Sequence, residues 1–220
     1  PEQTGRVVDG VIAHVQKVYV FPERRGPIVD AIRSDLAKGR FATQNPKELA
    51  ERLTETLVAA SNDKHLNVLF DPQRSASLNS PSKQDDESYF ETEGRKWNQG
   101  YVRQEILPGN VRYVRIRMFF WEEKETAGVI DSAARFLAGG STAIIDLRGN
   151  GGGHAVAVQR LISYLMPEKR VELMTFFDGQ TGKSEVASSM SKLPSPRILG
   201  RPVYVLTDRG SISAAEEFAY

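Results

Sequence analysis

The first part of the chain repeats apolar residues with the period of an α-helix. Apolar positions recur every three to four residues over 7–19, again over 28–36 and a third time over 49–57. This spacing places one apolar stripe along a helix. The third segment has the clearest start, with Asn45 in the cap position and Pro46 at the first helical position. Three short helices with apolar stripes predict a three-helix bundle at the N-terminus.

The pattern changes after the third helix. Polar and apolar residues alternate over 65–68 and two further apolar residues follow, so His65–Phe70 predicts a short strand. From residue 71 the chain is rich in Ser, Asp, Pro and Gln and has almost no large apolar residues, a composition typical of a linker or surface loop. We therefore expect a helical domain over 1–70, a flexible linker over 71–98 and a second domain over 99–220.

Strand and helix patterns alternate in the second domain. Apolar runs predict strands over 111–118, 143–147, 171–177 and 203–206. Helical periodicity predicts helices over 123–138 and 154–166. The segment 143–147 is strongly apolar, as expected for a buried central strand. The alternation indicates an α/β (α+β) fold class.

Composition narrows the function classes. Lys and Arg number 29 against 28 Asp and Glu, a net charge of +1, so charge gives no reason to expect nucleic acid or an anionic membrane as partner. No apolar run approaches the roughly 18 residues of a membrane-spanning helix. The chain has no cysteine, which excludes disulfides and a thiol nucleophile. No histidine pair has metal-ligand spacing, and we expect neither a metal nor another cofactor.

The segment Thr207–Glu217 is the first candidate for chemistry. It joins an apolar strand to an alanine-rich helix through a polar turn, with Ser213 at the start of the helix. A strand, a tight turn, a serine and a helix can present a nucleophilic hydroxyl beside free backbone N–H groups. Ser213 and Glu216 also have the S-x-x-E spacing of a capping box, which needs no catalysis. On the local pattern alone, the capping hypothesis is favoured.

The segment Asp146–His154 is the second candidate. It reads D-L-R-G-N-G-G-G-H and connects the predicted central strand to a helix. Consecutive glycines let a backbone approach another group closely and expose its N–H groups, as an oxyanion hole requires. A phosphate cradle is disfavoured because the segment has neither the G-K-[ST] ending of a P-loop nor G-x-G-x-x-G spacing. A simple tight turn stays equally open.

Three histidines are candidates for a general base. His14 lies in the first helical stripe and is interpreted as structural, and His154, beside the glycines, is ambiguous. His65 lies where the helical unit meets the α/β unit, a place where clefts commonly form. Ser213, His65 and the glycine turn would together supply a nucleophile, a base and oxyanion donors. Spacing alone does not show that they meet.

These motifs in combination resemble a known family. D-L-R-x-N-x-G-G at 146–153, followed by an apolar strand and S-A-A-E at 213–216, resembles the tail-specific or C-terminal processing serine peptidases, which have a ClpP/crotonase-like core. Y-x-F-P at 19–22, L-A-x-x-L at 49–53 and N-D at 62–63 are similar to the N-terminal domain of interphotoreceptor retinoid-binding protein and its bacterial relatives. We find no segment for the PDZ domain of the family's other branch.

The resemblance implies a role for individual residues. Ser213 matches the nucleophile, Ala214 and Gly152 the two oxyanion N–H donors, and His65 the base of the tricorn-like members. The residues implied to support the glycine turn are Asp146, Arg148, Asn150 and Gly153. The chain stops shortly after Ser213, so we expect a C-terminal part of the catalytic domain to be missing. The acidic residue that orients the histidine, or the lysine of a Ser–Lys dyad, is then expected beyond Tyr220.

The resemblance also implies a function. We expect a serine endopeptidase that forms an acyl-enzyme with unfolded-protein or C-terminal peptide substrates, exported to the periplasm or secreted, with its signal peptide outside this chain. The oligomeric state is left open. The first alternative is a non-catalytic binding protein for retinoid-like or fatty-acid-like ligands on the same scaffold. The second is a peptide-binding module that has lost its base.

Overall fold

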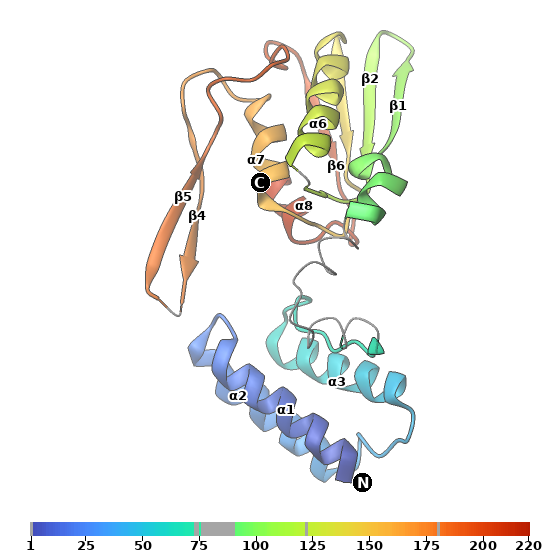
Figure 1. Ribbon diagram of the computed structural model, residues 1–220, viewed down its shortest axis with the longest axis vertical. Helices are drawn as coiled ribbons and strands as arrows, with labels where there is room; N and C mark the ends of the chain where they lie inside the picture. The colour runs from blue at the N-terminus through green and yellow to red at the C-terminus, as the bar shows by residue number, and fades with distance from the viewer. Residues whose placement is uncertain (1, 73–74, 76–90, 122, 180) are drawn as a thin grey trace. The chain divides into compact units, whose positions relative to one another are not determined.

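A computed structural model describes residues 2–72, 75, 91–121, 123–179 and 181–220 (Figure 1). The chain divides into two compact units. The first comprises 1–80 with 177–183, and the second comprises 81–176 with 184–220. The expected linker over 71–98 falls largely on residues 73–74 and 76–90, which lie outside the described residues.

The first unit contains the three predicted helices. They are α1 (Glu2–Val18), α2 (Pro22–Ala37) and α3 (Pro46–Ser61). The α3 start is as predicted, because the Asn45 side chain accepts hydrogen bonds from the N–H groups of Lys47 and Glu48 at 3.0 and 3.5 Å. The stripes of the helices form one core, whose fully buried members include Val8, Ile28, Ile32 and Leu53. The prediction of an N-terminal three-helix region is therefore confirmed.

The strand predicted at His65–Phe70 is wrong. Residues 66–70 have no regular secondary structure. The Val68 N–H donates to Thr54 Oγ1 at 2.8 Å, and that hydroxyl is 3.2 Å from the Val68 carbonyl oxygen. Leu66 and Val68 pack against the helical core. The alternation of polar and apolar residues therefore comes from an extended segment that lies along α3. The backbone of this segment is hydrogen-bonded to a side chain of α3 and not to another strand.

The second unit is built on a four-stranded sheet. Its strands are β1 (Tyr101–Leu107), β2 (Val111–Ile116), β3 (Thr142–Asp146) and β6 (Val203–Leu206), in the order β1-β2-β3-β6. β1 and β2 are antiparallel, whereas β2, β3 and β6 are parallel. β3 lies in the interior of the sheet between β2 and β6, which confirms the central position predicted from its apolar sequence.

Helices and a β-ribbon complete the described part of this unit. α6 (Glu123–Ala138) has the bounds predicted from its periodicity, and α7 (Ala155–Ser163) and α8 (Ala214–Ala219) follow the two candidate turns. α6 packs against β1, β2 and β3, and α7 packs against α6 and α8 (Figure 1). A short 3-10 helix covers Asn98–Gly100. β4 (Glu172–Asp178) and β5 (Lys183–Ser188) form a separate two-stranded sheet.

The core of the second unit lies between the sheet and its helices. Alternate residues of β2 and β3 are fully buried there, including Val114, Ile116 and Ile145. Their neighbours Tyr113 and Ile144 point to the other face and are only partly buried. This alternation is that of strands with one face against the core.

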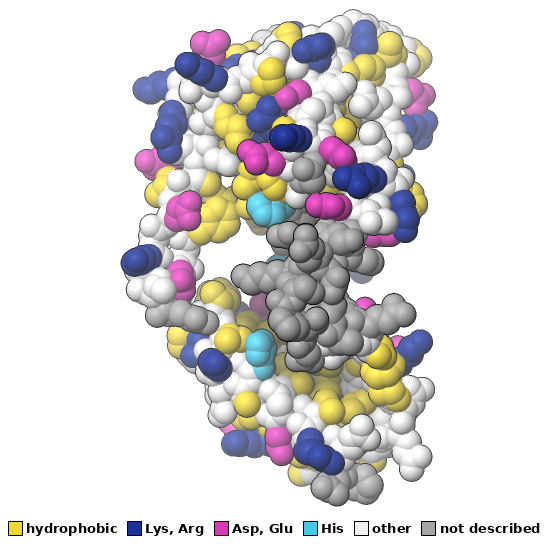
Figure 2. All heavy atoms as spheres, viewed as in Figure 1, with side chains coloured by type: hydrophobic (Ala, Val, Ile, Leu, Met, Phe, Trp, Pro, Cys, Tyr) yellow, Lys and Arg dark blue, Asp and Glu magenta, His cyan; other side chains and the backbone are white. Residues whose placement is uncertain are grey.

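The surface carries charges of both signs. On the face shown in Figure 2, Lys and Arg side chains are interspersed with Asp and Glu, in keeping with the net charge of +1. Among the helices of the described residues, none is long and apolar enough to cross a membrane.

Candidate active site at the ends of β3 and β6

The two candidate segments begin at the same edge of the sheet. β3 and β6 are parallel neighbours, and Asp146 at the end of β3 is in register with Leu206 at the end of β6. Because parallel strands end at the same edge, the turns that follow them must lie side by side. The topology thus brings the glycine turn (147–153) next to the serine turn (207–213).

Asp208 forms hydrogen bonds to the backbone of both turns. Its Oδ1 accepts a hydrogen bond from the Gly149 N–H at 2.9 Å and another from the Gly210 N–H at 2.8 Å. These backbone donors, led by Gly149, hold the pKa of the Asp208 carboxyl below its ordinary value. Asp208 thus bridges the two turns as a charged acceptor.

Ser211 and Asn150 supply two further links. Ser211 Oγ donates to the Leu147 carbonyl oxygen at 2.7 Å, and the Ile212 N–H donates to the Asn150 carbonyl oxygen at 3.1 Å. Asp208 and Ser211 were not among the site residues predicted from the sequence. Their D-x-x-S spacing in a polar turn was a usable signal, since Asp and Ser side chains commonly bond the backbone of their own turn.

Gly152 packs directly against Ser213. The Gly152 φ is +91°, and a Cβ atom added there would lie 2.8 Å from Ser213 Cβ and 2.9 Å from the Ile212 carbonyl oxygen. Both the dihedral angle and the lack of space require glycine at this position. The central glycine of the G-G-G run therefore permits the close approach of the two turns.

Ser213 has a strained backbone. Its φ of +56° and ψ of −120° lie in a region that non-glycine residues rarely adopt. Such conformations cost on the order of 1–3 kcal/mol and cluster at functional sites. The Ser213 N–H donates to Glu216 Oε2 at 2.8 Å, which is one half of the predicted capping box. The cap and a catalytic role are therefore compatible, because the capping bond holds the strained serine in place.

The two expected oxyanion donors differ in their present bonding. Within the described part of the chain, the Ala214 N–H has no hydrogen-bond acceptor. The Gly152 N–H, in contrast, donates to Asn150 Oδ1 at 2.8 Å. Asn150 is fully buried, and its Nδ2 donates to the Ile116 carbonyl oxygen at 3.0 Å. Among the described residues the N–H of the buried Ala214 thus has no acceptor, whereas that of Gly152 is engaged with the amide of Asn150.

Asp146 and Arg148 brace the start of the glycine turn. The buried Asp146 carboxylate accepts from Arg148 Nε and Nη2 at 2.9 and 2.7 Å, from the Arg148 N–H at 3.0 Å and from the Tyr113 hydroxyl at 2.6 Å. The Arg148 guanidinium is the main cause that lowers the pKa of Asp146 well below its usual range, and it outweighs the opposing effect of burial. This cluster fixes where the chain leaves β3.

The three histidines lie in different settings. His154 caps α7, since its Nδ1 accepts from the Val156 N–H at 3.2 Å, and its ring stacks on Trp121 at 6.4 Å between centroids. His14 is exposed on α1. His65 belongs to the first unit, where its Nδ1 lies 2.9 Å from Asp63 Oδ1. The structure therefore joins the serine and glycine turns within one unit, and it carries His65 on the other.

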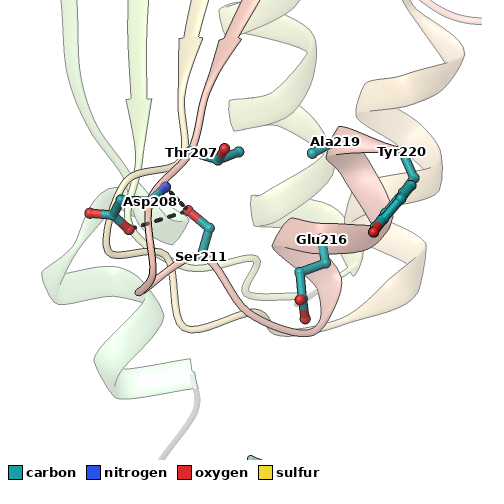
Figure 3. A pocket seen from close by; sticks show the side chains of 6 residues that line it. All are labelled: Thr207, Asp208, Ser211, Glu216, Ala219 and Tyr220. Atoms are coloured by element: carbon teal, nitrogen blue, oxygen red, sulfur yellow. Dashed lines mark hydrogen bonds between the residues drawn. The ribbon is translucent and has the colours of Figure 1, made fainter.

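A cavity of about 290 Å³ lies between the end of β6 and α8. Figure 3 shows Thr207, Asp208 and Ser211 on its β6 side and Glu216 and Tyr220 on its α8 side. Ser213 is not among its lining residues. We therefore place the candidate reaction centre at the Ser213 turn rather than in this cavity.

The fold and the two turns together define a class of protein. A serine in a strained turn between a parallel strand and a helix, packed against a glycine turn from the neighbouring strand, is an arrangement found in α/β serine hydrolases. The model of peptidase family S41 matches residues 110–220, half of the chain. The N-terminal domain of peptidase S41 in eukaryotic IRBP matches residues 2–98. The chain belongs to peptidase family S41.

The fold of this chain is also found in solved structures. A predicted peptidase from Parabacteroides merdae aligns with a TM-score of 0.56 at 19% identity, over 96% of this chain and 69% of that one. A lipoprotein from Streptococcus agalactiae aligns with a TM-score of 0.52 at 13% identity, over 98% and 71% of the two chains. At such identities these likenesses establish the fold alone. The family match is what supports a peptidase.

Proposed function

We propose that this protein is a serine-type endopeptidase that cleaves peptide bonds through an acyl-enzyme on Ser213. The observation that carries the proposal is the backbone of Ser213, held at φ +56° by a capping bond and packed against Gly152. A fold that needed only a helix cap would have no use for a strained residue in that position. A serine that is held in a strained conformation next to the Ala214 N–H, which has no acceptor among the described residues, is favoured as a nucleophile.

In the first half of the reaction, Ser213 Oγ attacks the carbonyl carbon of the scissile bond while His65 Nε2 takes the hydroxyl proton. The carbonyl π electrons move to the oxygen and give a tetrahedral oxyanion. When the oxyanion collapses, the C–N bond breaks and His65 returns the proton to the leaving amine. In the second half, His65 takes a proton from water, which attacks the ester carbonyl. The C–O ester bond then breaks, His65 returns the proton to Ser213 Oγ, and the new carboxyl terminus is released.

Ala214 and Gly152 are the proposed oxyanion donors. Each donor in comparable sites is worth about 3 kcal/mol of transition-state stabilisation. The Ala214 N–H is available for this role among the described residues. The Gly152 N–H has first to leave Asn150 Oδ1, or to share its proton between that amide and the oxyanion. Asn150 would then hold the second donor in place until substrate arrives.

The proposed substrates are unfolded chains or the C-terminal peptides of proteins, as the resemblance to the C-terminal processing peptidases implies. We also propose that the protein works outside the cytoplasm. One structure with this fold is a lipoprotein, and the family resemblance implies export. The matches to peptidase family S41 disfavour the alternative of a binding protein for retinoid-like ligands.

The test is hydrolysis of a quenched-fluorescent peptide library and of a denatured protein by the full-length protein. We expect the parent to cleave both and Ser213→Ala to lose at least about 1,000-fold in kcat/KM. Ser184→Ala changes an exposed serine of β5 and serves as the matched control. Unchanged activity in Ser213→Ala would sink the assignment. A parent that binds fatty acids or retinoids but cleaves nothing would favour the binding alternative instead.

A further inference from the structure

The first unit contains an acid–histidine pair that the sequence did not predict. Asp63 Oδ1 lies 2.9 Å from His65 Nδ1 and accepts the backbone N–H of the same residue, also at 2.9 Å. One carboxylate oxygen therefore fixes both the main chain and the ring of His65. The family resemblance, in contrast, led us to expect the acidic partner beyond Tyr220.

The end of α3 holds Asp63 in position. Ser61 is buried, and its Oγ donates to the Leu57 carbonyl oxygen at 2.7 Å and accepts the Asp63 N–H at 3.1 Å. Asn62 then turns the chain with a left-handed φ of +54° as the helix cap. These bonds direct the Asp63 side chain back toward the residue two positions later.

Tyr19 holds the second oxygen of the carboxylate. Its hydroxyl donates to Asp63 Oδ2 at 3.3 Å, and its side chain is buried in the helical core. Partial burial raises the pKa of Asp63, but the hydrogen bonds from His65 and Tyr19 outweigh it and keep that pKa below its ordinary value. Asp63 is therefore an anchored carboxylate at neutral pH, and its partner Tyr19 lies 44 positions earlier in the chain.

The contact decides which nitrogen of His65 can act. An ionised carboxylate only accepts hydrogen bonds, so the 2.9 Å contact places a proton on His65 Nδ1. The neutral ring then has its lone pair on Nε2, as a general base for a serine requires. The His65 side chain is 63% exposed. In the part of the chain that the structure describes, Nε2 has no hydrogen-bond partner.

We propose that Asp63 is the positioning residue for His65, the proposed general base. The proposal rests on the proposed peptidase function. Asp63 itself transfers no proton, and its role is to hold the Nδ1–H tautomer and the ring orientation.

The test combines histidine NMR with kinetics on the full-length protein. Ring ¹⁵N shifts of the three histidines, assigned with His65→Gln, report the tautomer of each neutral ring. In the parent we expect His65 to carry its proton on Nδ1. Asp63→Asn should shift His65 toward the Nε2–H form, leave His14 and His154 unchanged, and lower kcat at least about 100-fold with little change in KM.

Asp30→Asn, which changes an exposed carboxylate of α2, is the matched control and should alter neither readout. If Asp63→Asn does not fold, Tyr19→Phe replaces it, since it removes only the hydroxyl that holds Oδ2. It should move the His65 tautomer and kcat in the same direction by a smaller amount. An unchanged tautomer, or a parent-like kcat with a shifted tautomer, overturns the role of Asp63 in an active enzyme. A parent without peptidase activity overturns the proposed function first, whatever the NMR result.

Discussion

At the scale of single residues, the proposed function depends most on Ser213 and Gly152. Ser213 is both a helix cap and a strained residue, since its N–H donates to Glu216 and its backbone is held in a rarely adopted conformation. Gly152 is the residue that makes this conformation possible, because no side chain fits between the two turns at its position. The site is thus preorganised by the hydrogen bond from the Ser213 N–H to Glu216 and by the absence of a Cβ atom at Gly152.

Gly152→Ala should damage the site. The added methyl group would lie 2.8 Å from Ser213 Cβ on a backbone with φ +91°. We expect a loss of about 1–3 kcal/mol in stability and, because the turn must shift, a loss of about 100-fold in kcat/KM. Gly151→Ala is the matched control, since a Cβ there meets nothing within 4 Å and its φ is outside the left-handed region. Equal effects of the two variants on peptide hydrolysis would contradict this role of Gly152.

At the scale of elements, the ends of β3 and β6 define the site. The parallel register places their following turns side by side, and Asp208, Ser211 and Asn150 join the turns. Asp146 fixes the point where the first turn starts by binding Arg148 and Tyr113. The proposed site therefore depends on hydrogen bonds of residues that precede the three consecutive glycines at 151–153.

Asp146→Asn tests this brace through pH. The folded-state pKa of Asp146 is lowered, chiefly by Arg148, so its stabilisation is present above the unfolded pKa of about 3.9 and is lost as pH falls toward the folded pKa. We expect the variant to be less stable by about 2 kcal/mol at pH 7. The difference from the parent should shrink below about pH 4. Urea unfolding at several pH values measures it, with Asp9→Asn on α1 as the control for net charge. A pH-independent difference would show that the charge of Asp146 is not responsible.

The elements were predictable where local pattern determines them. α6 has the bounds that its periodicity indicates, and Asn45 caps α3 as its sequence implies. The strand at His65–Phe70 was mispredicted because an extended segment packed on a helix has the same alternation as a strand. β1 was not singled out because most of its residues are exposed.

The candidate site was predictable only in part. The D-L-R-x-N-x-G-G and S-A-A-E motifs identify Ser213 and the glycine turn. However, the contact of Gly152 with Ser213 depends on which strands are neighbours. The bond from Tyr19 to Asp63 likewise depends on how the residues that follow α1 and α3 lie next to each other. Such contacts follow from tertiary packing, which the spacing of residues along one chain does not encode.

At the scale of the whole molecule, the proposed chemistry divides between two units. The proposed nucleophile and oxyanion donors belong to the α/β unit, and the proposed base and its carboxylate belong to the helical unit. The model of family S41 covers residues 110–220, and the model of its N-terminal domain covers 2–98. The central claim is that Ser213 is the nucleophile of a serine peptidase.

The most direct test of this claim is the labelling of Ser213 by a fluorophosphonate probe, followed by intact-mass analysis and peptide mapping. The account predicts one adduct per chain, located on Ser213, with no adduct in Ser213→Ala and labelling slowed at least about 100-fold in His65→Gln. It also predicts normal labelling of Ser184→Ala. No adduct on the full-length parent, or an adduct formed as fast without His65, would contradict the account.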